Sequence, residues 1–115
     1  MAADLILLVV PDTAFRRSLE FALEADGFAV DSHAGTEPAF ASPSAAAAAC
    51  AIVDDAAVTD WSPASLQFLR FGRPVLILAG PFREVPELRR VSVVTKPFLG
   101  APLIDAVRQA TSGAA

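Results

Sequence analysis

The sequence predicts an α/β fold built on a five-stranded parallel sheet. Short apolar runs alternate with segments of helical spacing along the chain, which is the pattern of strand–helix units joined by right-handed crossovers. The run Cys50–Asp55 is apolar and ends in two adjacent acids, and such a run is typical of a strand buried on both faces. Because ligands collect at the carboxyl ends of parallel strands, these two acids stand where a site is expected.

Composition limits the size and the kind of protein. The 115 residues suffice for one domain, so we expect a single domain over residues 1–115 with a frayed tail at 111–115. Although 54% of the chain is hydrophobic, 24 residues are alanine, so the large core side chains are confined to a few stretches. The net charge of −4 and a pI near 4.7 argue against direct nucleic-acid binding.

Cysteine usage and the N-terminus indicate the compartment. Cys50 is the single cysteine, so it cannot form an internal disulfide, and its apolar neighbours predict a small core residue. The N-terminus lacks a basic region, and the apolar run Leu5–Val10 is too short for a signal peptide or a membrane span. We therefore expect a cytoplasmic protein without membrane contact.

In the first half of the chain, strands are predicted at Leu5–Val10 and Phe28–Val30. Pro11 ends the first strand because it has no N–H to donate. Asp12 or Thr13 then caps a helix that ends at Gly27 and buries one apolar face. The buried positions of this helix are predicted to be Phe15, Leu19, Ala22 and Leu23.

The stretch Thr36–Ala49 is the weakest part of the pattern. Thr36 and Pro38 indicate a helix start, but Pro43 interrupts the helix before a run of alanines. Alanine favours helix yet offers little area to bury. The sequence therefore predicts a broken or poorly anchored helix, with a low-complexity linker as the alternative.

In the second half, Ser62-Pro63 is predicted to start a helix that ends at Gly72. The fourth and fifth strands are predicted at Val75–Leu78 and Val91–Val94. The connection between them contains two prolines, so its helix is expected to be curtailed to a short turn. A last helix is predicted to start near Pro102 and to bury Leu103, Ile104 and Val107.

Three polar residues follow directly on strands: Asp12, Asp54 and Lys96. Together with the tripeptide Lys96-Pro97-Phe98 and with Arg17 in the first helix, their order and spacing resembles the receiver domain of bacterial response regulators over nearly the whole chain. The resemblance implies a flavodoxin-like, doubly wound sheet of strand order 2-1-3-4-5. It also implies a signalling role in a two-component phosphorelay, without enzymatic activity.

The resemblance implies a role for each residue of the site. Asp54 would be the aspartate that accepts a phosphoryl group from a partner histidine kinase, and Lys96 would pair with the phosphoryl oxygens. Asp12 and Asp54 would hold Mg²⁺, a hard cation that takes oxygen ligands and neutralises charge on the transferring group. The family carries a cis peptide bond at the position of Pro97, which would direct Lys96 over the sheet edge.

The sequence departs from the family at three positions of this site. Pro11 replaces the first of two acids after the first strand, Ala79 replaces the switch hydroxyl after the fourth, and Val93 replaces a switching aromatic. These replacements put Mg²⁺ binding and the readout of phosphorylation in doubt. Neighbouring side chains on a strand point to opposite faces, so we expect Asp55 to be a solvated loop acid or a hydrogen-bond partner on the helix side, with convergence on Asp54 as the alternative.

Two hypotheses within two-component signalling follow. The first is a divergent pseudo-receiver with impaired Mg²⁺-dependent phosphorylation that acts through protein–protein contacts, in which a Lys96–Asp54 ion pair is structural. The second is a functional receiver that a histidine kinase phosphorylates on Asp54. The expected partner is a histidine kinase or another signalling protein, bound through the first and last helices; a homodimer and a fragment of a longer regulator remain open.

A hypothesis from another class is a small flavodoxin-like binder of a nucleotide or cofactor. It needs a glycine-rich phosphate loop after the first strand, and residues 11–15 contain no glycine. Two single residues complete the prediction. His33, the only histidine, is expected at the surface, and Trp61 either plugs the core or forms an exposed contact.

Overall fold

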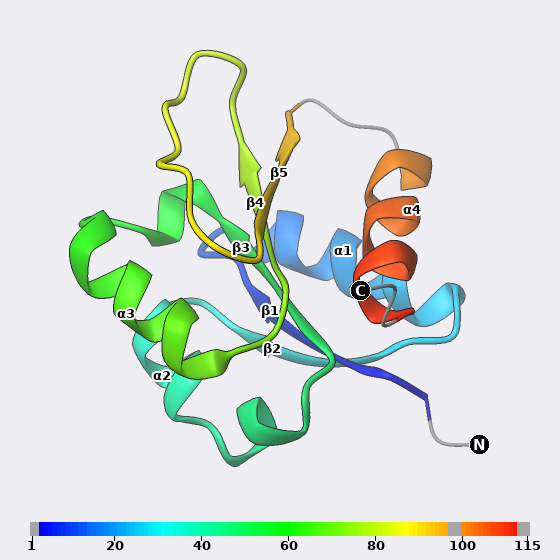
Figure 1. The fold of residues 1–115 in the computed structure, drawn as a ribbon. Coiled ribbons are helices and arrows are strands. Elements are labelled where there is room, and N and C mark those ends of the chain that lie inside the picture. The colour runs from blue at the N-terminus through cyan, green and yellow to red at the C-terminus, as the bar shows by residue number, and fades with distance from the viewer. Residues whose placement is uncertain (1–2, 97–99, 113–115) are drawn as a thin grey trace.

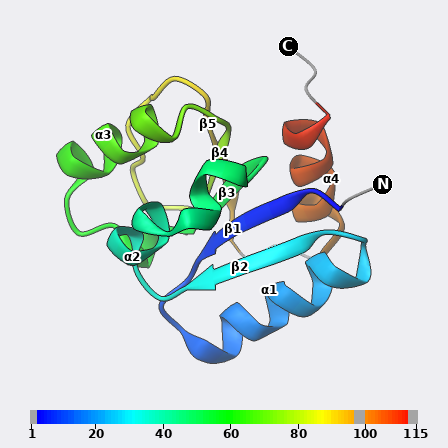
Figure 2. The same ribbon diagram turned by 90° about the horizontal axis from the view of Figure 1, so that it is seen from below.

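The computed structural model describes residues 3–96 and 100–112 and contains a five-stranded parallel sheet with helices on both faces (Figure 1; Figure 2). The strands are β1 (Leu5–Val9), β2 (Ala29–His33), β3 (Cys50–Asp54), β4 (Val75–Ala79) and β5 (Val91–Thr95). The helices are α1 (Thr13–Ala25), α2 (Thr36–Ala41), α3 (Trp61–Phe71) and α4 (Gly100–Thr111), with short 3-10 helices η1 (Pro43–Ala47) and η2 (Asp55–Ala57). The strand order β2-β1-β3-β4-β5 confirms the predicted fold.

The sheet separates two cores. On β1, Leu7 and Val9 pack with α2 and α3, whereas Ile6 and Leu8 pack with α1 and α4, because successive strand side chains point to opposite faces. All four side chains are fully buried. β1 lies between β2 and β3, so the sequence correctly predicted a central first strand. None of the helices among the described residues is long and apolar enough to cross a membrane.

The ends of β2 and of the last helix differ from the sequence prediction. β2 continues to His33 instead of ending at Val30, because its backbone pairs with β1 over its whole length. It is an edge strand whose residues are only partly buried, so it tolerates polar residues. Because of these polar residues the strand pattern ended too early in the sequence. α4 begins at Gly100 and runs to Thr111, which the prediction had placed in the frayed tail. Residues 113–115 lie outside the described part.

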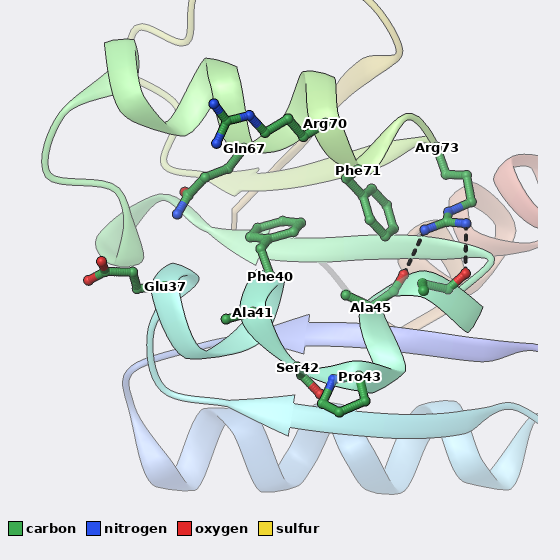
Figure 3. Close-up of a pocket in the computed structure, with 11 residues that line it drawn as sticks. Glu37, Phe40, Ala41, Ser42, Pro43, Ala45, Gln67, Arg70, Phe71 and Arg73 are labelled. Carbon is green, nitrogen blue, oxygen red and sulfur yellow. Dashed lines mark hydrogen bonds between the residues drawn. The ribbon is translucent and has the colours of Figure 1, made fainter.

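The predicted broken helix is present as α2 and η1 (Figure 3). Arg73, beyond the end of α3, donates hydrogen bonds to the Ala45 and Ala46 carbonyls (2.6 and 3.0 Å) and its guanidinium lies 4.5 Å from the Phe71 ring centre. Phe40 of α2 meets the Phe71 ring edge-on, with ring centres 5.5 Å apart. The small alanines leave a hollow of about 450 Å³ between these elements and α3.

The connection from β4 to β5 contains neither helix nor strand. Residues 80–90 form turns at each end with an irregular stretch between them, which is consistent with the prediction that this connection holds at most a short helical turn. Val85 and Leu88 pack against the core on the α3 side of the sheet. Phe82 is 98% exposed, so its ring takes no part in this packing.

The start of α3 was predicted two residues too late. Asp60, rather than Ser62-Pro63, is the cap: its carboxylate accepts the Ser62 N–H at 3.0 Å, and the helix starts at Trp61. The C-terminal end agrees with the prediction, because Gly72 adopts the left-handed conformation (φ +71°) that ends many helices.

The corrected cap gives a testable prediction. We expect Asp60→Ala to lower the free energy of unfolding by about 1 kcal/mol, because one N–H at the helix start loses its acceptor. Ser62→Ala is the matched control and should change stability by less than about 0.5 kcal/mol. Urea unfolding of the two variants measures both values, and a larger loss in the Ser62 variant would contradict the assignment.

Candidate functional site

The candidate site lies at the carboxyl ends of β3, β4 and β5. Asp54 is the last residue of β3, and Lys96 directly follows β5. The Lys96 N–H donates to the Ala79 carbonyl at 2.7 Å, so the backbone ladder continues for one residue beyond β5. This bond fixes the backbone of Lys96 beside the end of β4, from where its side chain reaches across to β3.

The Lys96 ammonium holds two neighbouring carboxylates. It donates a short hydrogen bond to Asp54 Oδ1 and a second one, 3.0 Å long, to Asp55 Oδ1. The Asp54 and Asp55 side chains are only 5% and 11% exposed, and that of Lys96 is 29% exposed. The three residues form a largely buried ion cluster, which we call the acid–lysine cluster.

Asp55 does not follow the sequence prediction. It is buried and paired instead of being a solvated loop acid. β3 ends at Asp54 and the backbone turns at once into η2, so the strand alternation that separates neighbouring side chains no longer applies. The two acids therefore converge on Lys96, which is the alternative that regular strand geometry disfavoured.

Two further groups hold the other oxygen of Asp55. The Gly80 N–H donates to Asp55 Oδ2 at 3.4 Å, and Arg83 Nε lies 3.7 Å from the same oxygen. Both belong to the β4–β5 connection, so Asp55 ties that connection to the end of β3. On the opposite side, the ring centre of Phe15 from α1 lies 5.8 Å from the ammonium of Lys96. No sequence pattern identified Gly80, Arg83 or Phe15 as parts of this cluster.

Electrostatics favour the charged forms of Asp55 and Lys96. Burial alone would raise the pKa of the Asp55 carboxyl, but hydrogen bonding with Lys96 and Asp54, the ammonium charge and the Gly80 N–H together lower that pKa below its ordinary value. Burial alone would lower the pKa of the Lys96 ammonium, but its hydrogen bonds to both carboxylates, and their charges, raise that pKa above its ordinary value. The mutual pairing outweighs desolvation for both groups.

Asp12 and Pro11 take no part in the acid–lysine cluster. Asp12 is exposed, and its carboxylate caps α1 by accepting the Ala14 N–H at 3.1 Å. Arg16 Nη1 donates to the Val10 carbonyl at 2.8 Å and steadies the β1–α1 turn. The structure therefore shows Asp12 as a helix cap, which is one of the two roles that the sequence suggested for it.

These residues do not fit the Mg²⁺ site that the family implies. An ammonium already bridges Asp54 and Asp55, Asp12 is turned to its helix, and Pro11 supplies no carboxylate. Within residues 3–96 and 100–112, no three His, Cys, Asp or Glu side chains form a group that could hold a metal ion. Mg²⁺ prefers several oxygen ligands in octahedral geometry, which this arrangement does not offer.

The predicted switch positions carry no switching groups. Ala79 is the buried last residue of β4, and Val93 is a half-exposed residue of β5. Neither offers the hydroxyl or the aromatic ring that the family uses there. Pro97, the predicted cis proline, lies outside the described residues, so its geometry stays a prediction.

The environments of Cys50, His33 and Trp61, the three single residues considered in the sequence analysis, indicate structural roles. Cys50 is fully buried at the start of β3, and burial, followed by the charge of Asp4, raises the pKa of its thiol to about 12, so the thiol is inert. His33 is partly exposed on the edge strand β2, with Nε2 2.9 Å from Asp31 Oδ2. Trp61 is half-buried and packs against the core on the α3 side. Packing into the core was one of the two alternatives that the sequence left open.

Comparison with known proteins agrees with this fold. The chain is 36% identical to the transcriptional regulator protein FixT of Rhizobium meliloti over 104 residues, which cover 89% of this chain and 88% of that protein. No family model matches the sequence.

Solved structures of receivers share the architecture. The chemotaxis protein CheY4 of Vibrio cholerae superposes with a TM-score of 0.78 at 18% identity, covering 95% of this chain and 99% of that one. A response regulator receiver protein from Sinorhizobium medicae gives 0.78 at 23% identity, with 96% of each chain covered. At these identities the likeness establishes the fold alone. The chain therefore belongs to the family of the regulator FixT and has the receiver-domain fold of response regulators.

Proposed function

We propose that this protein is a receiver-like module of a two-component phosphorelay that acts through protein–protein contacts and has impaired Mg²⁺-dependent phosphorylation. The observation that supports the proposal is the Lys96 ammonium, which bridges Asp54 and Asp55 where a metal-dependent site would need free carboxylate oxygens. In an active receiver, the aspartate oxygen attacks the phosphoryl group while a divalent cation neutralises the growing charge. Here that oxygen is already hydrogen-bonded to a cation of the chain itself.

The ion cluster has a structural role in this proposal. It ties the end of β3 to β5 through Lys96, and to the β4–β5 connection through Gly80 and Arg83. Metal binding or phosphorylation would have to break these contacts. The module thus keeps one arrangement of its sheet edge, and a partner recognises that arrangement.

The partner in this proposal is a histidine kinase or another signalling protein in the cytoplasm, and the module itself is not an enzyme. The relative FixT is named a transcriptional regulator. For this chain we propose an effect on transcription through another protein, since the net charge of −4 opposes direct contact with DNA. The second candidate is a functional receiver, which the position of Lys96 beside Asp54 favours, because an ammonium in this place would pair with the oxygens of a phosphoryl group on Asp54.

Phosphoryl uptake separates the two candidates. After incubation with acetyl phosphate and Mg²⁺, intact-mass spectrometry should find no phosphoryl group on the wild type, under conditions that fully modify an ordinary receiver. The reason is that Asp54 Oδ1 stays paired with Lys96. Asp54→Asn is the control for modification elsewhere. If the wild type gains a phosphoryl group only with Mg²⁺ and the Asp54→Asn variant gains none, the protein is a functional receiver and the proposed function is wrong.

Removing the ammonium tests the structural role of the cluster. At pH 7, Lys96→Met should lower the free energy of unfolding by about 2 kcal/mol, because two buried carboxylates lose their counter-charge. Arg83→Met removes a longer and more exposed pair, and should cost less than about 1 kcal/mol. Equal losses in the two variants, measured by urea unfolding, would show that Lys96 is a surface ion pair only.

The same variant should show a defined pH dependence. The pKa of Asp55 is lowered in the folded protein, so its pairing stabilises the fold above the unfolded pKa of about 3.9, and this stability is lost as pH falls through the folded value. The gap between wild type and Lys96→Met should therefore be full at pH 7 and narrow below about pH 4. Unfolding curves at pH 7 and pH 3.5 measure it, and a gap that widens in acid contradicts the cluster.

A further inference from the structure

A groove runs along α3 on the side that faces the β4–β5 connection. Two adjoining hollows of about 440 and 200 Å³ share Phe68, Leu69 and Arg89 and together follow the helix from Ser62 to Gly72. Both views show α3 beside the connection (Figure 1; Figure 2). The residues that complete the lining are Ser65, Leu66, Leu88 and Arg90.

The groove exists because an expected helix is missing. Parallel neighbouring strands are usually joined by a crossover helix packed on the sheet, but residues 80–90 are irregular. A helix in this place would cover the outer side of α3. Instead, Leu66 and Leu69, one turn apart on α3, are 54% and 69% exposed. These two leucines and the partly buried Leu88 form an apolar strip. The apolar face of an amphipathic helix can lie on such a strip.

The charge of the groove is opposite to that of the whole chain. The only charged residues in its lining are Arg89 and Arg90, among the residues that the structure describes. Arg90 is held in place because its guanidinium donates to the Gly72 carbonyl and its backbone adopts a positive φ of 63°. Arg89 is exposed and forms no ion pair with another described residue. In the sequence, residues 70–90 hold five arginines and two glutamates, although the chain carries a net −4.

We infer that this groove is a docking site for an acidic amphipathic helix of a partner protein. The apolar face of that helix lies on Leu66 and Leu69 and takes the place of the missing crossover helix. Its carboxylates pair with Arg89 and Arg90 at the end of the groove near Gly72. The inference rests on the proposed function in one respect, namely that a module acting through protein contacts needs a surface for its partner.

A peptide pair tests both the apolar and the electrostatic part of the inference. The probe is a stapled helical peptide of about 16 residues, long enough to cover α3, with leucines at i, i+3, i+4 and i+7 spacing and glutamates on the flanks. The second peptide of the pair has lysine in place of every glutamate. The whole-chain charge favours the lysine peptide, whereas the groove favours the glutamate peptide, so the two predictions have opposite signs.

We expect the glutamate peptide to bind, and amide resonances of α3 and residues 88–90 to shift in two-dimensional NMR spectra of the intact chain. Leu69→Ser and Arg89→Glu should each weaken binding by at least about fivefold. The matched controls are Phe21→Ser and Arg17→Glu, exposed residues of α1 on the opposite face of the sheet, which should leave the affinity unchanged. All four positions are exposed, so the variants should keep the fold.

Four results would overturn the inference: no binding, equal or tighter binding of the lysine peptide, shifts confined to other faces, or self-association through the groove in place of peptide binding. The outcome is separable from that of the proposed function. Phosphoryl uptake on Asp54 would refute the proposed function and leave the groove intact, whereas failure of the peptide with no phosphoryl uptake would remove the groove alone.

Discussion

Two adjacent buried carboxylates need a cation, and Lys96, the only lysine of the chain, supplies it. Their mutual pairing outweighs the cost of burial, as the opposite pKa shifts of Asp55 and Lys96 indicate. Because β4 lies between β3 and β5, this contact spans the sheet edge and orders three strand ends at once. A receiver fold normally keeps this edge open for a metal and a phosphoryl group. Here the Lys96 ammonium is hydrogen-bonded to oxygens of both carboxylates at this edge, and this contact is the basis of the function that we propose.

The fold was largely predictable, because buried parallel strands are continuous apolar runs bounded by turn residues. β1, β3 and β4 follow that rule and were located within a residue or two. β2 was cut short because an edge strand tolerates polar residues such as Asp31, which carry no strand signal. The cap of α3 was missed because Asp60 and Ser62 are both good capping residues. Only the backbone geometry, with the helix beginning at Trp61, distinguishes the two.

The site was predictable only as a set of neighbouring strand ends. The sequence correctly brought Asp54 and Lys96 together, because their strands run parallel in one sheet. It could not place Asp55, since that depends on whether the chain leaves the strand before or after this residue. Asp12 was ambiguous for a similar reason: one carboxylate can cap a helix or face the site, and its backbone decides. The contacts of Gly80 and Arg83 come from an irregular connection without periodicity.

The pKa of the Lys96 ammonium, with and without Mg²⁺, is the most direct measurement of this account. Because the chain has a single lysine, one side-chain nitrogen resonance reports on it without ambiguity. We predict a pKa above the ordinary value of about 10.4 that does not change when Mg²⁺ is added. An ordinary pKa, or a raised one that falls on addition of Mg²⁺, would mean that the carboxylates are available to the metal. It would contradict the closed acid–lysine cluster on which the proposed function depends.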